Sequence, residues 1–257
     1  MTSQNGAAAA ASCASSPVPE GPGPFSGDPS GMMEVRVESR GITCAEILHD
    51  LDARICELVV GLRVLTRAQA AHALGSSCRE AMGRLYQLGF LDRLVTGRTP
   101  PGYCPGPELR RKRPMQLGAF TALRFLRLVA AAQFWVCLSG GSWRAEPYLG
   151  FQGRWEYRGA VFWVIAPRLW PLEVEWFREN VGFLPEGDRV IVVAGTRQLA
   201  EECARVCPPH VEARYTWDKA LAPGGPVQLW AAGKRGLEEA EVLPGRGIDN
   251  RGPPVLG

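Results

Sequence analysis

Three short patterns, each a Ser or Thr followed three residues later by Glu or Gln, constrain the first half of this chain. They begin at Thr43, Thr66 and Ser77. In such a pair each side chain accepts a hydrogen bond from the other residue's backbone N–H, so the pattern is typical of the start of a helix. The second and third starts are eleven residues apart, which leaves room only for a short helix between them.

The first two starts predict two helices of different length. After Thr43, apolar residues recur at helical spacing and form one stripe. The stripe consists of Ile47, Leu48, Leu51, Ile55, Leu58, Val59 and Leu62. The second helix begins at Thr66 and is expected to end at Gly75, because glycine accepts the left-handed backbone conformation in which many helices end.

The third helix, after Ser77, has two unlike faces. Its apolar face consists of Cys78, Ala81, Leu85 and Leu88, and its outer face of Ser76, Arg79, Gly83, Arg84 and Gln87. Glu80 lies on the outer face too, but is assigned to the cap rather than to base recognition. A short helix, a tight Gly–Ser turn and a second helix with a polar outer face form the helix-turn-helix pattern, whose second helix enters the major groove of DNA. Residues 90–103 predict a strand, a Gly/Pro-rich turn and a return strand, which together would form a wing.

The distribution of charge points in the same direction. The whole chain carries a net charge of +3, but residues 63–113 contain ten basic and three acidic residues, which gives +7. Such a local excess attracts a phosphate backbone. We therefore expect duplex DNA to be bound by Arg67, Ser76, Ser77, Arg79, Arg84, Gln87, Arg93, Arg98, Arg110, Arg111, Lys112 and Arg113. A solvated face on a protein-docking domain is the alternative.

From residue 115 onward, helical and strand patterns alternate, as in an α/β fold. Residues 115–135 predict a helix that runs into a strand at 134–138, and 146–152 and 159–167 predict two further strands. A helix is expected after Pro171, and Thr196 is expected to cap another. The remaining predicted strands are 188–195, 211–217 and 227–233.

The order of these elements resembles the replication-relaxation family of bacterial plasmids and mobile elements. The resemblance covers roughly residues 42–232 and is carried by the segments "EPYLGF…FWVIAPR" and "RVIVVAGTRQLAEEC". It implies a winged helix followed by a restriction-endonuclease-like domain, with an accessory role in replication, relaxation or transfer. Where the family has acidic motifs, this chain has Tyr148 after Pro147, and Ile165, Ala166 and Pro167 at the second position. The resemblance therefore implies a degenerate nuclease site.

The sequence also argues against catalysis. Metal-dependent cleavage of DNA needs several carboxylates around a divalent cation, and only Glu146 lies near the expected position. The chain has neither a phosphate-binding loop nor a dinucleotide fingerprint. Cys203, Cys207 and His210 lack the second pair of ligands that a zinc finger has. We therefore predict no catalytic residue, no metal and no cofactor.

Aromatic residues are concentrated in the predicted hairpin of the second half. They are Phe151, Trp155, Tyr157, Phe162 and Trp163. Such side chains can stack on the bases of a single strand, but on strands they more often pack in a core, which is the interpretation favoured here.

These observations predict an α/β protein, α+β overall, of four parts. They are a disordered tail (1–41), a winged helix-turn-helix domain (42–113), a degenerate nuclease-like domain (114–235) and a flexible C-terminal tail (236–257). We expect a cytoplasmic, non-enzymatic protein with reduced cysteines and no membrane segment. Its expected partner is duplex DNA. A replication or mobilisation protein and a second copy of the chain, in a homodimer, are further candidate partners. A transcriptional regulator and a protein-interaction adaptor without DNA binding are the alternatives.

Overall fold

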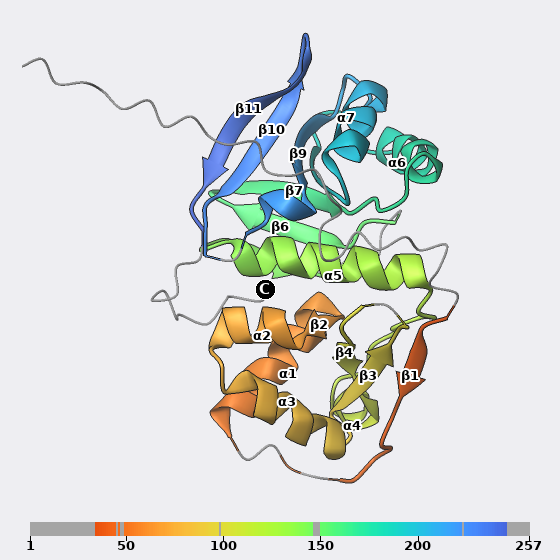
Figure 1. Ribbon diagram of the computed structural model, residues 1–257, viewed down its shortest axis with the longest axis vertical. Coiled ribbons are helices and arrows are strands. Elements are labelled where there is room, and N and C mark those ends of the chain that lie inside the picture. Colours follow the sequence, from red (N-terminus) through yellow and green to blue (C-terminus); the bar gives the residue numbers. More distant parts are fainter. Residues whose placement is uncertain are drawn as a thin grey trace, which may run out of the picture.

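Capping residues and short apolar runs divide the described chain into seven α-helices and two β-sheets. The structure, a computed structural model, describes residues 34–245 apart from 45, 47, 48, 98, 146–149 and 223. The mixed α/β class that the sequence predicts is confirmed at this level. Figure 1 shows the elements, with the smaller sheet and α1–α4 in its lower half and the larger sheet in its upper half.

The first half of the chain forms a four-stranded sheet in the order β1-β3-β4-β2, in which all neighbours are antiparallel. Its elements are β1 (Arg36–Glu38), α1 (Asp50–Leu62), β2 (Leu65–Thr66), α2 (Arg67–Leu74), α3 (Cys78–Gln87), β3 (Leu91–Val95), β4 (Gly102–Pro105) and α4 (Pro107–Lys112). The strand and return strand expected around residues 90–103 are confirmed as β3 and β4. Strand β1 lies within the segment expected to be a disordered tail, so that expectation is wrong for these residues.

The capping box that begins α2 is confirmed. The Thr66 hydroxyl accepts from the Gln69 N–H at 3.2 Å, and the Gln69 side-chain oxygen accepts from the Thr66 N–H at 2.9 Å. The helix ends at Gly75, whose φ of 103° few other residues adopt. Both ends of α2 are therefore fixed by local sequence, as predicted.

The other two predicted capping boxes are wrong. The Thr43 hydroxyl donates to the carbonyl oxygen of Leu88 at 2.6 Å, and α1 begins only at Asp50. The backbone of Ser77 is already helical, with φ −61° and ψ −14°, and its side chain makes no capping bond. The turn before α3 therefore begins the helix with backbone bonds, among them Arg79 N–H to the Ser76 carbonyl oxygen.

Helix α5 (Ala122–Cys137) begins at Thr121, whose hydroxyl accepts from the Arg124 N–H at 3.2 Å. The strand expected at 134–138 is wrong, because the helix continues to Cys137. A short apolar run alone does not distinguish a buried strand from a buried helix. In the part of the chain that the structure describes, no helix is long and apolar enough to cross a membrane.

The second half forms a seven-stranded sheet in the order β11-β10-β9-β8-β7-β6-β5. Its central strands β7, β8 and β9 are parallel, and the outer pairs on both sides are antiparallel. The elements are β5 (Ser142–Arg144), β6 (Gly153–Tyr157), β7 (Ala160–Ile165), α6 (Leu172–Gly182), β8 (Arg189–Ala194), α7 (Arg197–Val206), β9 (Glu212–Trp217), β10 (Val227–Gly233) and β11 (Gly236–Leu243).

Several predictions for this half are confirmed, and two need correction. Thr196 caps α7, since its hydroxyl accepts from the Leu199 N–H at 3.2 Å. The strand expected at 146–152 lies partly outside the described residues, and β6 begins only at Gly153. Strand β11 occupies residues that were expected to belong to a flexible tail, so the sheet extends beyond residue 235.

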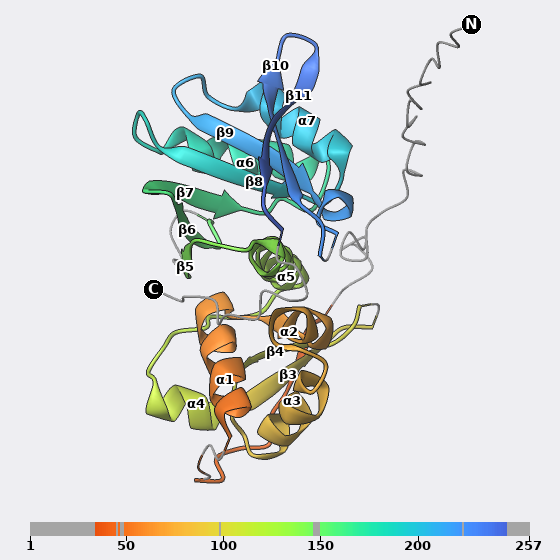
Figure 2. The ribbon, with the colours of Figure 1, turned by 90° about the vertical axis from the view of Figure 1, so that its left-hand side faces the viewer.

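Helix α5 lies between the two halves of the molecule (Figures 1 and 2). One of its sides contacts α1, α2 and β2, and another contacts β7 and β8. One apolar cluster therefore runs from Ile55 on α1 through Phe134 on α5 to Leu243 on β11. Helices α6 and α7 cover the opposite face of the larger sheet, over a second cluster that includes Phe177, Val192 and Leu199.

Gln69 should stabilise the contact between α2 and α5 as well as the start of α2. Its side-chain nitrogen donates to the Val129 carbonyl oxygen at 2.8 Å, and the residue is buried. We expect Gln69→Ala to lower the free energy of unfolding by about 1–3 kcal/mol, because one buried bond and one cap are lost together. Urea unfolding followed by circular dichroism measures this, with Gln198→Ala, at an exposed position in the first turn of α7, as the control. Equal midpoints for the two variants would contradict the assignment.

Candidate nucleic-acid interface

Helix α3 is held by its apolar side and exposes the other. Cys78, Ala81, Met82 and Leu85 are buried against α1 and α2, and Leu88 is half-buried. The predicted apolar face is therefore confirmed, with Met82 as an addition. The exposed residues around α3 are Ser76, Ser77, Arg79, Glu80, Arg84 and Gln87, so this face carries one acid beside its arginines.

Arg84 is exposed but not unpaired. Its Nη2 lies 2.6 Å from Oδ1 of Asp52 on α1, and its Nε donates to Oδ2 at 3.2 Å. Asp52 is buried, and the hydrogen bonds that its carboxylate accepts from Arg84 raise the pKa of Arg84 above the usual value. This two-bond ion pair directs the guanidinium of Arg84 toward α1. Arg84 could therefore contact a base only if its ion pair with Asp52 were broken.

Most other predicted basic residues are paired as well. The pairs are Arg93–Glu38 at 2.7 Å, Arg110–Asp92 at 3.2 Å, Arg111–Glu108 at 2.5 Å, Lys112–Glu108 at 3.7 Å and Arg113–Glu57, with one hydrogen bond of 2.6 Å. Glu38, Asp52 and Glu57 lie outside residues 63–113. The charge of +7 counted along that segment therefore overstates the positive field that its surface carries.

The basic run Arg110–Arg113 does not join the exposed face of α3. It belongs to α4 and the residue after it. Figure 2 shows α3 and α4 on opposite sides of α1. In this view α1 separates the run from the exposed side of α3.

The arginines on α2 and the exposed side of α3 are different. In the described residues, neither Arg67 nor Arg79 has a carboxylate partner. The guanidinium of Arg67 lies 5.4 Å from the centre of the Tyr103 ring, and its Nη2 lies 3.8 Å from the place that a Cβ at Gly83 would take. Arg79 precedes Gly83 by one helical turn, so these two arginines flank a bare stretch of helix backbone.

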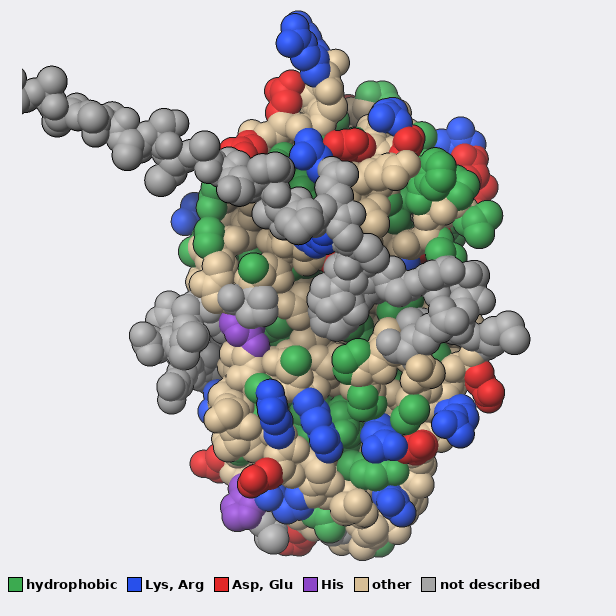
Figure 3. Space-filling model, in the orientation of Figure 1, with side chains coloured by type: hydrophobic (Ala, Val, Ile, Leu, Met, Phe, Trp, Pro, Cys, Tyr) green, Lys and Arg blue, Asp and Glu red, His purple; other side chains and the backbone are tan. Residues whose placement is uncertain are grey.

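Tyr86 continues this surface, since it follows Gly83 by three residues on α3. Arg40 and Arg93 lie over its ring at 5.2 and 5.8 Å from the centre. We call Arg40, Arg67, Arg79, Gly83, Tyr86 and Arg93 the α3 surface. Figure 3 shows Lys and Arg side chains in a row across the lower half of the molecule, where α2, α3, β3 and β1 lie. Arg98 lies outside the described residues.

Arg40 and Tyr86 were not predicted as site residues. Tyr86 lies seven residues after Arg79, the spacing of one helix face, and this signal could have found it. Arg40 lies in the segment expected to be a tail, and only its contact with Tyr86 reveals it.

The expected nuclease positions in the second half are apolar where the structure describes them. Ile165 and Ala166, at the end of β7, are completely buried, while Glu146, Pro147 and Tyr148 lie outside the described residues. Within the described residues, no three His, Cys, Asp or Glu side chains are grouped so that they could hold a metal ion. The charged side chains just after β7 and β9, Arg168 and Asp218, form a buried ion pair at 2.6 Å.

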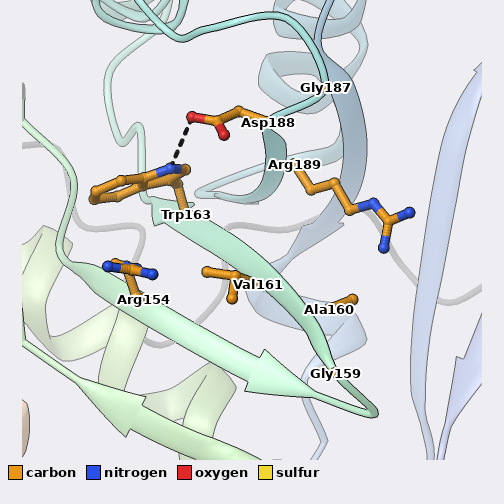
Figure 4. Close-up of a pocket in the computed structure, with 8 residues that line it drawn as sticks. All are labelled: Arg154, Gly159, Ala160, Val161, Trp163, Gly187, Asp188 and Arg189. Atoms are coloured by element: carbon orange, nitrogen blue, oxygen red, sulfur yellow. Dashed lines mark hydrogen bonds between the residues drawn. The ribbon is translucent and has the colours of Figure 1, made fainter.

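The aromatic residues of the β6–β7 hairpin pack largely as expected. Phe151 and Trp155 are buried, and Tyr157, Phe162 and Trp163 are half-buried. Trp163 borders an open pocket of about 380 Å³ (Figure 4), where its indole N–H donates to Asp188 at 3.1 Å. Arg154 lies on the other side of this indole, 5.2 Å from a ring centre. The N–H edge of the indole is thus bonded to Asp188, and one of its faces lies against Arg154.

The Arg84–Asp52 pair should contribute to stability, independently of any ligand. Arg84→Ala leaves the buried Asp52 carboxylate without its cation, and Asp52→Ala leaves the guanidinium unpaired, so each should lower the midpoint of urea unfolding. The double variant should lose less than the sum of the two single losses, because the pair is then removed as a unit. Arg79→Ala, the matched control on the same helix, should leave the midpoint unchanged. Strictly additive losses would show that the pair contributes nothing.

No family model, no curated protein and no solved structure matches this chain.

Proposed function

We propose that this chain is a non-enzymatic protein that binds duplex DNA through the α3 surface. The observation that carries the proposal is the contrast between arginines. Arg67 and Arg79 on this surface have no carboxylate partner in the described chain, whereas Arg93 on the same surface and Arg84, Arg110 and Arg113 outside it do. Unpaired guanidinium groups on an exposed helix are suited to phosphates and guanine edges.

The arrangement of elements supports the proposal. A helix, a short strand, two helices joined at Gly75–Ser77, and a two-stranded hairpin that pairs with the short strand follow one another from α1 to β4. We infer that residues 42–113 form a winged helix-turn-helix domain, in which α3 is the helix that enters the major groove. Gly83 would let the groove approach the helix backbone closely, since glycine has no side chain.

For the second half, we propose that residues 114–235 form a degenerate nuclease-like domain that serves as a scaffold. The order of a helix, a three-stranded antiparallel meander, a helix and a parallel strand, from α5 to β8, supports this proposal. The apolar end of β7 supports the degeneracy, because it offers no carboxylate to a metal. An accessory role in plasmid or mobile-element replication, relaxation or transfer rests on the sequence resemblance alone.

A protein-interaction adaptor is the second candidate. Trp170, Leu172 and Phe183, around α6, have exposed fractions of 52%, 75% and 71%. Large apolar side chains so exposed often mark a surface that contacts another protein. A transcriptional regulator would share the DNA-binding surface of the first candidate.

DNA binding can be tested with duplexes selected from a random pool and with scrambled duplexes. Affinity should fall steeply with salt, because counterions are released from the phosphates. Arg79→Ala should cost about 1–3 kcal/mol on the selected duplex and less on the scrambled one, as expected for a contact with a base edge. Fluorescence anisotropy at several salt concentrations measures both effects.

Arg111→Ala is the matched control, since Arg111 is exposed, paired with Glu108, and on the far side of α1. It should change the affinity little. If the folded protein binds no duplex even at low salt, the adaptor is favoured instead. If Arg79→Ala and Arg111→Ala have equal effects, α3 does not read the DNA.

A further inference from the structure

Two arginines near the junction of the two halves are half-buried and lack an acid. Twelve arginines lie within 4.0 Å of a carboxylate that belongs to the described residues. Arg63, directly after α1, and Arg124, in the first turn of α5, have no such partner among the described residues. Both side chains are nevertheless partly shielded from water.

The two guanidinium groups contact the same short segment, between α4 and α5. Arg63 Nη1 lies 3.1 Å from the Met115 sulfur, which is a weak acceptor. Arg124 Nη1 donates to the Ala119 carbonyl oxygen at 2.7 Å, and its guanidinium lies 5.4 Å from the centre of the Phe120 ring. Each guanidinium has five N–H donors, so most of them are not used by these contacts.

This arrangement is electrostatically unfavourable as it stands. Burial lowers the pKa of both arginines, and the charge of Arg124 lowers that of Arg63 further. Arg124 also lies in the first turn of a helix, where the helix dipole disfavours a cation. Arg63 has a φ of 66°, a conformation that a residue with a side chain rarely adopts. Strain of this kind is often kept where a residue has a function.

We propose that Arg63 and Arg124 together bind a phosphate group. A phosphate offers several oxygens that two guanidinium groups can share, and its charge would offset the repulsion between them. The phosphate could come from a nucleic-acid backbone or from a free phosphate ion, and the two sources are separated by the experiment. The site is distinct from the α3 surface, and it does not depend on the function proposed above.

The experiment titrates the full chain with inorganic phosphate and follows the midpoint of thermal unfolding. Sodium chloride keeps the ionic strength constant. The midpoint of the original protein should rise with phosphate, because a ligand bound only by the folded state stabilises it. This rise should disappear in Arg63→Gly and in Arg124→Gln.

Arg63→Gly also separates binding from folding. Glycine accepts the positive φ, so without phosphate this variant should unfold at a higher temperature than the original protein. Arg158→Gly is the matched control, since Arg158 has a φ of 51° and lies in the exposed β6–β7 turn. It should also gain stability, but should keep the full response to phosphate.

The same variants identify the source of the phosphate. If Arg63→Gly and Arg124→Gln bind duplex DNA more weakly, with a salt slope flatter by about one unit, the site holds a backbone phosphate. If they lose the phosphate response while DNA affinity is unchanged, or while no DNA binds at all, the site takes free phosphate. The proposal is overturned if phosphate stabilises the original protein no more than sodium chloride does, or if both variants keep its full response.

Discussion

The burial of α5 on several sides is the constraint on which the rest of the structure depends. From Phe125 to Cys137, only Arg127 is not buried, so no face of this part of the helix is exposed to water. One side completes the core of the first half and another completes the core beneath the larger sheet. Neither core is therefore closed without α5, and we expect the two halves to unfold as one cooperative unit.

Local sequence predicted an element well where nearby residues determine it. Thr66 and Thr196 cap helices because the donors they satisfy are on the same turn. Thr43 has the same local pattern, but its hydroxyl donates to the carbonyl oxygen of Leu88, which is distant in the sequence. Strand β11 escaped prediction because its pattern is dominated by glutamate, and only its pairing with β10 makes it a strand.

The candidate site shows the same limit for charge. Arg79 and Arg84 look equivalent in the sequence, yet Asp52, far back along the chain, pairs with one of them only. A charge count over a segment cannot include acids that folding brings to it from elsewhere. The sequence therefore identified a basic region, whereas the separation into paired and unpaired arginines required the packing of α3 on α1. Arg98, the other predicted arginine of the wing, lies outside the described chain.

The acidic strand β11 has a consequence for how copies of this protein can meet. It is the outer strand of the larger sheet, and its Glu238, Glu239 and Glu241 side chains are exposed. An outer strand has unpaired backbone groups that can extend the sheet into another molecule. Two copies joined along β11 would bring their carboxylates together, at a cost in repulsion. The charge of this edge thus disfavours the pairing of β11 with the same strand of a second copy.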